Sequence, residues 1–500
     1  MKKAVLIIFG LGLLFFTEIC SAEPKGDLVV CQGAEINSLD PARHRALTDL
    51  NYSIQVFDML YFRDEKANPV PRLALSHKVI NDMTWEFALR RGVKFHNGAV
   101  LTAKDVKFSI DRMIDPQTKA FPYPWFSTIK EVKVVDDHTV QIVTKSPDPI
   151  LLKRLGQDLI ILPSDLFREK GGEAFFQHPV GTGPFKFVSW IINDRMVLEA
   201  NEGYWDGAPK VKRLILRAVP EVSTRLAELL SGNADIISNI PPFLVSQVKE
   251  SANATVQSIL TGRVQFLCIN CLADGPLKNK SVRQALNYAV DKKAIIENIL
   301  KGSGVPRAVN LSPYQFGFDP SLTPYPYDPA KAKKLLAEAG YPNGIKLVLN
   351  TPSGRYLLDK EVSEAITGMF KAVGIEADLR IVEWGTYTQT LMSKKLQDLG
   401  FIGLADTTQD ADINLTLYFT PESTYSYYST PELAEKIKRA RTTMDEKKRL
   451  EIYKEVQREI YEEAPLVFLY QQMDHYGISK KVKGFQARGD EQLVLNQASK

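Results

Sequence analysis

The sequence predicts an α/β fold, because segments with strand and helix patterns alternate in its last third. Residues 345–349 are an apolar strand, and apolar side chains at helical spacing follow over 362–373. Residues 375–381 then alternate apolar and charged side chains, as a half-buried strand does. Long amphipathic helices over 432–463 and an apolar strand over 466–470 come last. A strand, a helix and a second strand in succession are typical of α/β proteins.

The first third of the chain shows the same mixture of elements. Residues 28–31 form a short apolar strand, and residues 48–61 carry apolar side chains at helical spacing. Residues 85–89 alternate as a half-buried strand. A capping-box pattern at Thr102 and Asp105 then marks the start of a second helix.

Turn and cap residues mark two further units. Residues 129–135 and 139–144 read as two strands of a hairpin, joined by a pair of aspartates. A helix begins with Asp328 as N-cap and Pro329 at the first helical position, and Gly340 ends it. No internal repeat or low-complexity linker marks a domain border.

The N-terminus has the pattern of a secretory signal peptide. Two lysines precede thirteen apolar or glycine residues over 4–16, and a short polar stretch follows. We therefore expect residues 1–22 to be removed, so that the exported chain begins at Glu23. Acylation of Cys20 is the alternative, although a lipoprotein signal usually has small residues before its cysteine. No later segment approaches the ~20 apolar residues of a membrane-spanning helix, so a soluble mature chain is expected.

Length and charge narrow the class of protein. Removal of the signal peptide leaves 478 of 500 residues, enough for two or three domains. The 63 basic and 59 acidic residues are interspersed and give a net charge of only +4. No long basic run is present, and the composition does not favour a nucleic-acid partner.

Three cysteines remain after export, and the odd number leaves at least one thiol unpaired within a monomer. Cys268 and Cys271 lie in or beside an apolar strand, where residues three apart point to opposite faces and are badly placed to bond each other. Two interpretations remain: buried small hydrophobic residues, or one disulfide that joins Cys31 to Cys268 or Cys271.

The residue patterns do not favour an enzyme. The chain has no Gly-x-Ser-x-Gly or phosphate-binding Gly-Lys-Ser/Thr motif, and the Ser-x-x-Lys strings at Ser127 and Ser246 are very common in proteins. The six histidines show no close pairing, which argues against a zinc site. The Gly-Thr-Gly-Pro segment at Gly181 lacks the setting of a dinucleotide loop. We expect no catalytic residues, no metal and no cofactor.

Several long motifs carry a family resemblance. Residues 81–113, NDMTWEFALRRGVKFHNGAVLTAKDVKFSIDRM, resemble the extracellular solute-binding protein family 5, the dipeptide- and oligopeptide-binding type. The resemblance continues in order with GAEINSLDPA from Gly33, GTGPFKF from Gly181, NEGYWDGAP from Asn201, VRQALNYAVDKKAI from Val282, YDPAKAKKLLAEAGYPNG from Tyr327 and EAPLVFLY from Glu463. It covers nearly the whole mature chain.

The resemblance implies a two-lobed periplasmic-binding-protein fold of the three-domain, peptide-binding (class II, cluster C) type. Lobe I would comprise residues 23–61, 179–267 and 479–500, an inserted domain II residues 62–178, and lobe III residues 268–478. It also implies a periplasmic receptor of an ABC importer, monomeric, which closes on a small peptide and delivers it to permease subunits in the inner membrane.

The resemblance also suggests a pair of charged residues for the two ends of a peptide. Asp406 matches the family's amine-holding aspartate, although Gly403 and Ala411 stand where a tryptophan and an Asp-Pro step are frequent. This departure bears on peptide specificity, and Asp406 is alternatively a loop cap. Arg355 matches a position that reaches a ligand carboxylate, and its alternative is a structural ion pair with Asp359.

Four further residues are candidate cleft residues. Trp384 and Tyr387, beyond the strand at 375–381, either stack on the ligand or pack the lobe. Glu35 and Asn37, after the first strand, resemble cleft residues of the family and alternatively cap a turn.

Three other functions compete with the peptide receptor. The family also includes receptors for nickel complexes, sugars and other small solutes, so a non-peptide ligand is the main alternative. A periplasmic hydrolase would turn over a peptide, and a chaperone or adhesion protein would bind without closure of the lobes.

Overall fold

The computed structural model describes residues 26–43, 47–65, 68–157, 159–405 and 408–500. The expected signal peptide with Cys20, the expected new N-terminus at Glu23, and Asp406 lie outside the described residues. Within these residues, no helix is both long and apolar enough to cross a membrane.

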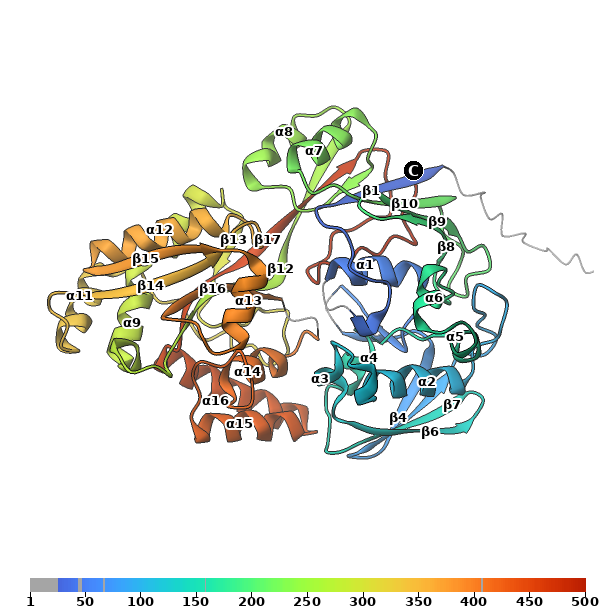
Figure 1. Ribbon diagram of the computed structural model, residues 1–500, viewed down its shortest axis with the longest axis horizontal. Coiled ribbons are helices and arrows are strands. Elements are labelled where there is room, and N and C mark those ends of the chain that lie inside the picture. Colours follow the sequence, from blue (N-terminus) through green and yellow to red (C-terminus); the bar gives the residue numbers. More distant parts are fainter. Residues whose placement is uncertain (1–25, 44–46, 66–67, 158, 406–407) are drawn as a thin grey trace, which may run out of the picture.

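The chain forms two lobes that share one sheet (Figure 1). Within the described residues this central sheet has eleven strands. Their order is β15 (Ile375–Val382), β14 (Ile345–Pro352), β16 (Leu399–Ala405), β12 (Ala254–Ile269), β17 (Leu466–Ser479), β11 (Ile236–Ile237), β1 (Asp27–Gln32), β10 (Arg213–Ala218), β9 (Arg195–Ala200) and β8 (Phe185–Ile191), with β13 (Gly304–Pro306) paired to β17.

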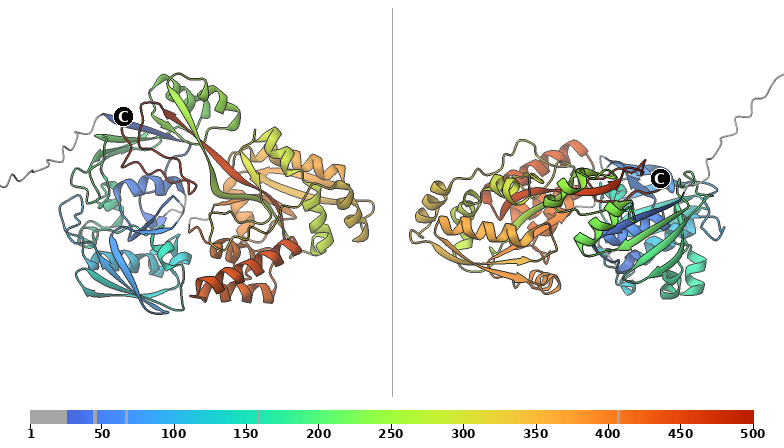
Figure 2. Two further views of the ribbon diagram at one scale, coloured as in Figure 1. Left: turned by 180° about the vertical axis from the view of Figure 1, so that it is seen from behind. Right: turned by 90° about the horizontal axis from the view of Figure 1, so that it is seen from above.

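Strands β12 and β17 join the two lobes. They pair antiparallel from Ala254 opposite Ser479 to Cys268 opposite Leu466, and the register shifts between Leu260 and Val264. Figure 1 and Figure 2 show this long ribbon crossing from one lobe to the other. We call the half with α1–α8 and β1–β11 the N-terminal lobe, and the half with α9–α16 and β13–β16 the C-terminal lobe.

The N-terminal lobe contains a second, smaller sheet. Its order is β4 (Ala74–Asn81), β5 (Thr84–Leu89), β7 (Thr139–Thr144) and β6 (Ile129–Asp136), and α2 (Ala103–Ile114) packs on it. With α3 (Tyr123–Phe126) and α4 (Leu151–Leu155) these strands form what we call the small sheet domain, which has a hydrophobic core of its own. The other elements of this lobe are α1 (Leu47–Val56), β2 (Tyr61–Arg63), β3 (Pro69–Pro71), α5 (Ser164–Lys170), α6 (Gly172–Gln177), α7 (Val222–Ser231) and α8 (Val245–Lys249).

The C-terminal lobe has a single large hydrophobic core around β14 and β16. Helix α12 packs on β14 and β15, and α15 and α16 form an antiparallel pair at one end of the lobe (Figure 1). Its helices are α9 (Lys280–Ala289), α10 (Lys292–Ala294), α11 (Pro329–Glu338), α12 (Asp359–Ala372), α13 (Trp384–Met392), α14 (Ala411–Phe419), α15 (Pro431–Thr442) and α16 (Glu446–Glu463).

Most predicted elements are confirmed, and their cap residues act as expected. The carboxylate of Asp328 accepts a hydrogen bond from the Lys331 amide at 2.9 Å at the start of α11, and Gly340 has φ +94° just beyond its end. The Thr102 amide donates to Asp105 at 2.9 Å, as a capping box requires. The predicted hairpin is the β6–β7 pair.

The helix predicted over 48–61 is too long, because α1 ends at Val56. The segment at Gly181 and Gly183 lies against the Val56–Phe57 backbone so closely that a side chain on either glycine would collide with it. The Gly183 amide donates to the Val56 carbonyl at 2.9 Å. The apolar spacing extends as far as Tyr61 because the first residue of the following strand β2 is also buried.

All three cysteines in the described part of the chain are free thiols. Cys31 and Cys268 are buried, and burial raises the pKa of both, that of Cys31 to about 11. The disulfide alternative is therefore not formed, and these two residues pack as small hydrophobic side chains.

Candidate functional site

The loop after β14 carries an exposed arginine, Arg355. Asp359, at the start of α12, accepts hydrogen bonds from the amides of Gly354, Arg355 and Tyr356 at 2.9–3.0 Å. The Asp359 carboxylate therefore fixes the loop backbone. Among the described residues the Arg355 side chain has no ion pair, so the predicted alternative of a structural bond to Asp359 is not formed.

Two aromatic rings hold the Arg355 guanidinium in place. Its central carbon lies 5.0 Å from the centroid of the Tyr356 ring and 5.0 Å from that of Trp384. The two rings meet edge to face at 5.8 Å. Rings at this distance attract a cation and restrict its motion without neutralising its charge.

Arg355 is exposed, yet its pKa lies below the ordinary value. Desolvation by the surrounding protein is the main cause, and the positive charge of Arg263 is the second. Arg355 is thus an exposed cation close to a second positive charge, and an anion would be attracted there.

Arg263, the second arginine near Arg355, lies on one of the strands that join the lobes. It lies on β12 next to the register shift, opposite Ala405 of β16. Its guanidinium bonds to Glu491, in the C-terminal segment, at 3.0 Å. Since Arg263 is already paired with a carboxylate, Arg355 is the one of these two arginines that has no ion pair among the described residues.

Trp384 and Tyr387 lie on α13 and stack on each other at 5.9 Å. Trp384 is half-buried and faces Arg355, whereas Tyr387 is buried and its hydroxyl donates to the Phe401 carbonyl at 2.6 Å. The Trp384 ring is therefore available to contact a ligand beside Arg355, and the buried Tyr387 ring packs behind it.

Glu35 and Asn37 lie in the other lobe, after β1. The Glu35 carboxylate accepts the Asn193 amide at 2.7 Å and its own neighbour's amide at 2.9 Å. The Asn37 side chain donates to Asp49 of α1 at 3.2 Å. Both side chains thus hold turns, as the alternative interpretation expected, and neither belongs to the group around Arg355.

Several residues of the site were not predicted from the sequence. Tyr356 is adjacent to Arg355, and aromatic residues beside an arginine are a weak signal that could have identified it. Arg263 and Glu491 carry no local signal, because they are 228 positions apart in the chain.

The described residues contain no group of three or more His, Cys, Asp or Glu placed to hold a metal ion.

Comparison with known proteins gives consistent results. Residues 68–426 match the family described as bacterial extracellular solute-binding proteins, family 5 Middle. The glutathione-binding protein GsiB of Pectobacterium atrosepticum is 30% identical over 480 residues, which cover 93% of this chain and 92% of that protein.

Two solved structures show the same fold over nearly their full length. The periplasmic binding protein DppA from Helicobacter pylori, in complex with the peptide STSA, has a TM-score of 0.81 and 26% identity, and the match covers 95% of this chain and 98% of that one. NikZ from Campylobacter jejuni, in complex with Ni(L-His), has a TM-score of 0.84 and 26% identity, with coverages of 95% and 100%.

Proposed function

This chain belongs to the bacterial extracellular solute-binding proteins of family 5, and we propose that it is the periplasmic receptor of an ABC importer for a small peptide or peptide-like solute. Its relatives bind glutathione and a peptide, which supports this ligand class. A nickel complex, as in NikZ, is the alternative. The partners of the receptor are the permease subunits in the inner membrane.

The observation that carries the proposal is the guanidinium of Arg355, which has no ion pair among the described residues. It is exposed, and it lies 5.0 Å from the ring centroids of Tyr356 and Trp384. A buried carboxylate needs a fixed opposite charge, and the planar guanidinium offers two parallel hydrogen bonds. A ligand with a carboxylate end, such as a peptide, meets this requirement.

The same proposal gives roles to the remaining candidates. Asp406 would hold the ammonium end, and Trp384 would stack on the ligand with Tyr387 behind it. Glu35 and Asn37 would shape the wall of the opposite lobe. The chain divides into lobe I (23–61, 179–267 and 479–500), domain II (62–178) and lobe III (268–478), and the separate cores of the small sheet domain and the C-terminal lobe support this division.

Ligand is expected to close and stabilise the protein. Small molecules are released by denaturing freshly purified protein and are identified by mass spectrometry, and the metal content of the same extract is measured. The identified molecule is then titrated into ligand-free protein. One equivalent should bind intact, reduce the radius of gyration in X-ray scattering and add about 2.7 kcal/mol of stability at a hundred times the dissociation constant. Cleavage of the bound peptide would contradict a receptor, and released nickel with an organic chelator would favour the alternative ligand.

Export should leave a chain that begins at Glu23. The run of apolar residues over 4–16 and the small residues before this position are the reasons. Peptide mapping of protein from the periplasmic fraction checks the new N-terminus. Recovery of Met1, or of an acylated Cys20, in exported protein would contradict this processing.

A further inference from the structure

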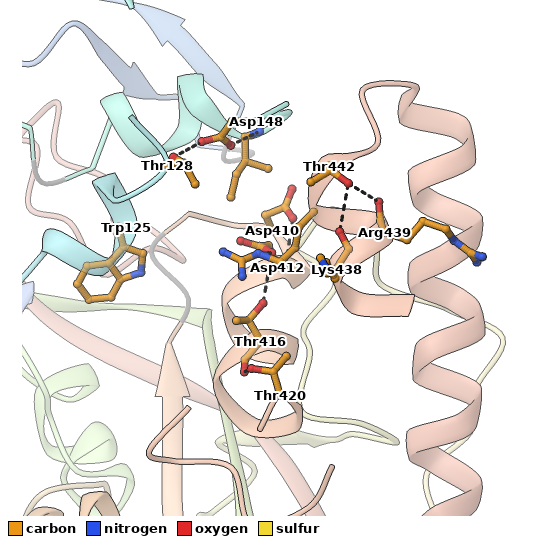
Figure 3. A network of polar contacts seen from close by, with 12 residues as sticks. Trp125, Thr128, Asp148, Asp410, Asp412, Thr416, Thr420, Lys438, Arg439 and Thr442 are labelled. Atoms are coloured by element: carbon orange, nitrogen blue, oxygen red, sulfur yellow. Dashed lines mark hydrogen bonds and ion pairs between the residues drawn. The ribbon is translucent and has the colours of Figure 1, made fainter. Parts of the chain in front are cut away.

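The small sheet domain and the C-terminal lobe contact each other through buried charges (Figure 3). Helix α4 of the small sheet domain carries Lys153 and Arg154. The start of α14 in the C-terminal lobe carries Asp410 and Asp412. The two aspartates are 0% and 3% exposed, so the contact excludes water almost completely.

Lys153 reaches across the gap between the lobes. Its ammonium donates to the Gln409 carbonyl at 2.7 Å and lies 3.4 Å from the Asp410 carboxylate. It also lies 5.6 Å from the centre of the Phe316 ring. Among the described residues, each of these partners of the ammonium belongs to the opposite lobe.

Arg154 is bonded on both sides of the gap. It donates to Asp412 of the C-terminal lobe at 3.0 Å. Within its own domain it donates to the Trp125 carbonyl at 2.7 Å and lies 3.4 Å from Asp148. The Asp148 carboxylate also accepts a hydrogen bond from Thr128 at 2.7 Å (Figure 3).

The aspartates are likewise paired inside their own lobe. Asp410 is the N-cap of α14 and forms an ion pair with Arg449 of α16. Asp412 forms an ion pair with Arg441 of α15 at 2.9 Å. If the lobes separate, Arg154, Asp410 and Asp412 each keep an oppositely charged partner.

This arrangement suits a contact that forms and breaks repeatedly. When the lobes separate, only Lys153 loses all the partners named above. Among the described residues it has no charged partner in its own domain, so its attractive charge contacts all come from the opposite lobe.

The segment that Lys153 and Arg154 bind also adjoins the candidate ligand site. Gln409 lies against Gly262 at the register shift of β12, where a side chain on the glycine would come within 3.2 Å of the Gln409 amide. The neighbouring Arg263 pairs with Ala405 and is close to Arg355. The Gln409–Asp412 stretch therefore contacts both the joining strand β12, beside Arg263, and helix α4.

We propose that Lys153 and Arg154 are positioning residues for ligand capture, which bind Gln409–Asp412 when the lobes close and so hold the closed state. The proposal depends on closure of the lobes and not on the identity of the ligand.

The test measures the distance between the lobes. Cysteines replace the exposed Lys78 of β4 and Lys334 of α11 in a Cys271→Ser background, and spin labels on them report the distance by pulsed electron resonance. Protein is measured as purified and again after its bound small molecules are removed by reversible denaturation. The labelled protein that keeps Lys153 and Arg441 should show a short-distance population in at least one of these states.

Lys153→Met should lower the ratio of closed to open protein by at least about five-fold, and Lys153→Glu should lower it further by placing a carboxylate against Asp410. Lys153→Arg should restore most of the closed population. Arg441→Gln is the matched control, because it removes a charge from the same cluster but leaves the contacts across the gap intact. It should not open the protein.

Three results would overturn the proposal. The first is an unchanged distance in Lys153→Glu, and the second is opening of Arg441→Gln to the same extent as Lys153→Glu. The third is the absence of a short-distance population, in both states, from the labelled protein that keeps Lys153 and Arg441. Circular dichroism should show native folding of the Lys153 variants, since the named contacts of this ammonium lie outside its own domain. A failure of peptides to bind would count against the proposed ligand and leave the distance result to stand by itself.

Discussion

Arg355→Gln is expected to weaken a ligand with a free carboxylate by roughly 30-fold or more. The guanidinium has no ion pair within the described part of the chain, so the ligand supplies the opposite charge. Loss of one member of a buried pair leaves the other desolvated and uncompensated. Glutamine keeps much of the size and hydrogen-bonding capacity of the side chain but has no charge. Calorimetric titration with the ligand and with its carboxyl-amidated form measures the effect.

Asp406→Asn supplies the reciprocal control. It should weaken a ligand with a free amino end by a similar factor and have much less effect on the N-acetylated form. Arg355→Gln should show the opposite preference and be sensitive only to amidation. Equal losses for free and blocked ligands would mean that the two residues only support the fold, and unchanged affinities would place the site elsewhere.

The fold was largely predictable because its signals are local. The Asp328 cap, the stop at Gly340 and the alternation over 375–381 each depend on residues a few positions apart. The end of α1 was not predictable in this way. It depends on Gly181 and Gly183, which approach Val56 from more than a hundred residues further along the chain.

The candidate site could be predicted only where a residue's role depends on residues next to it in the sequence. A Gly-rich turn after a strand indicated Arg355, but the sequence does not show that Asp359 bonds the amides of this loop instead of the Arg355 side chain. Trp384 and Tyr387 were equivalent candidates in the sequence, and packing of α13 exposes one and buries the other. Lys153 and Asp410 are 257 positions apart, and no local pattern relates them.

The motif around Tyr204 is explained by a buried carboxylate, that of Asp58. This carboxylate accepts hydrogen bonds from Tyr204 and Trp205 at 2.9 Å and from Thr182 at 3.0 Å. The Arg72 guanidinium lies 3.4 Å away. Asp58 thus links the end of α1 to three other segments of the N-terminal lobe. They are the residues just before β4, the motif that begins at Gly181 and the motif that begins at Asn201.

Asp58→Ala is therefore expected to destabilise the N-terminal lobe by about 3–5 kcal/mol, because it leaves three donors without their acceptor and removes the buried one of the two carboxylates that pair with Arg72. Asp206→Ala is the matched control: Asp206 bonds the same Arg72 at 2.7 Å but is 46% exposed, and an exposed pair contributes at most about 1 kcal/mol. Scanning calorimetry of the ligand-free proteins should show a much larger fall in melting temperature for Asp58→Ala. Equal falls for the two variants would mean that water replaces the Asp58 carboxylate and that burial adds nothing to this contact.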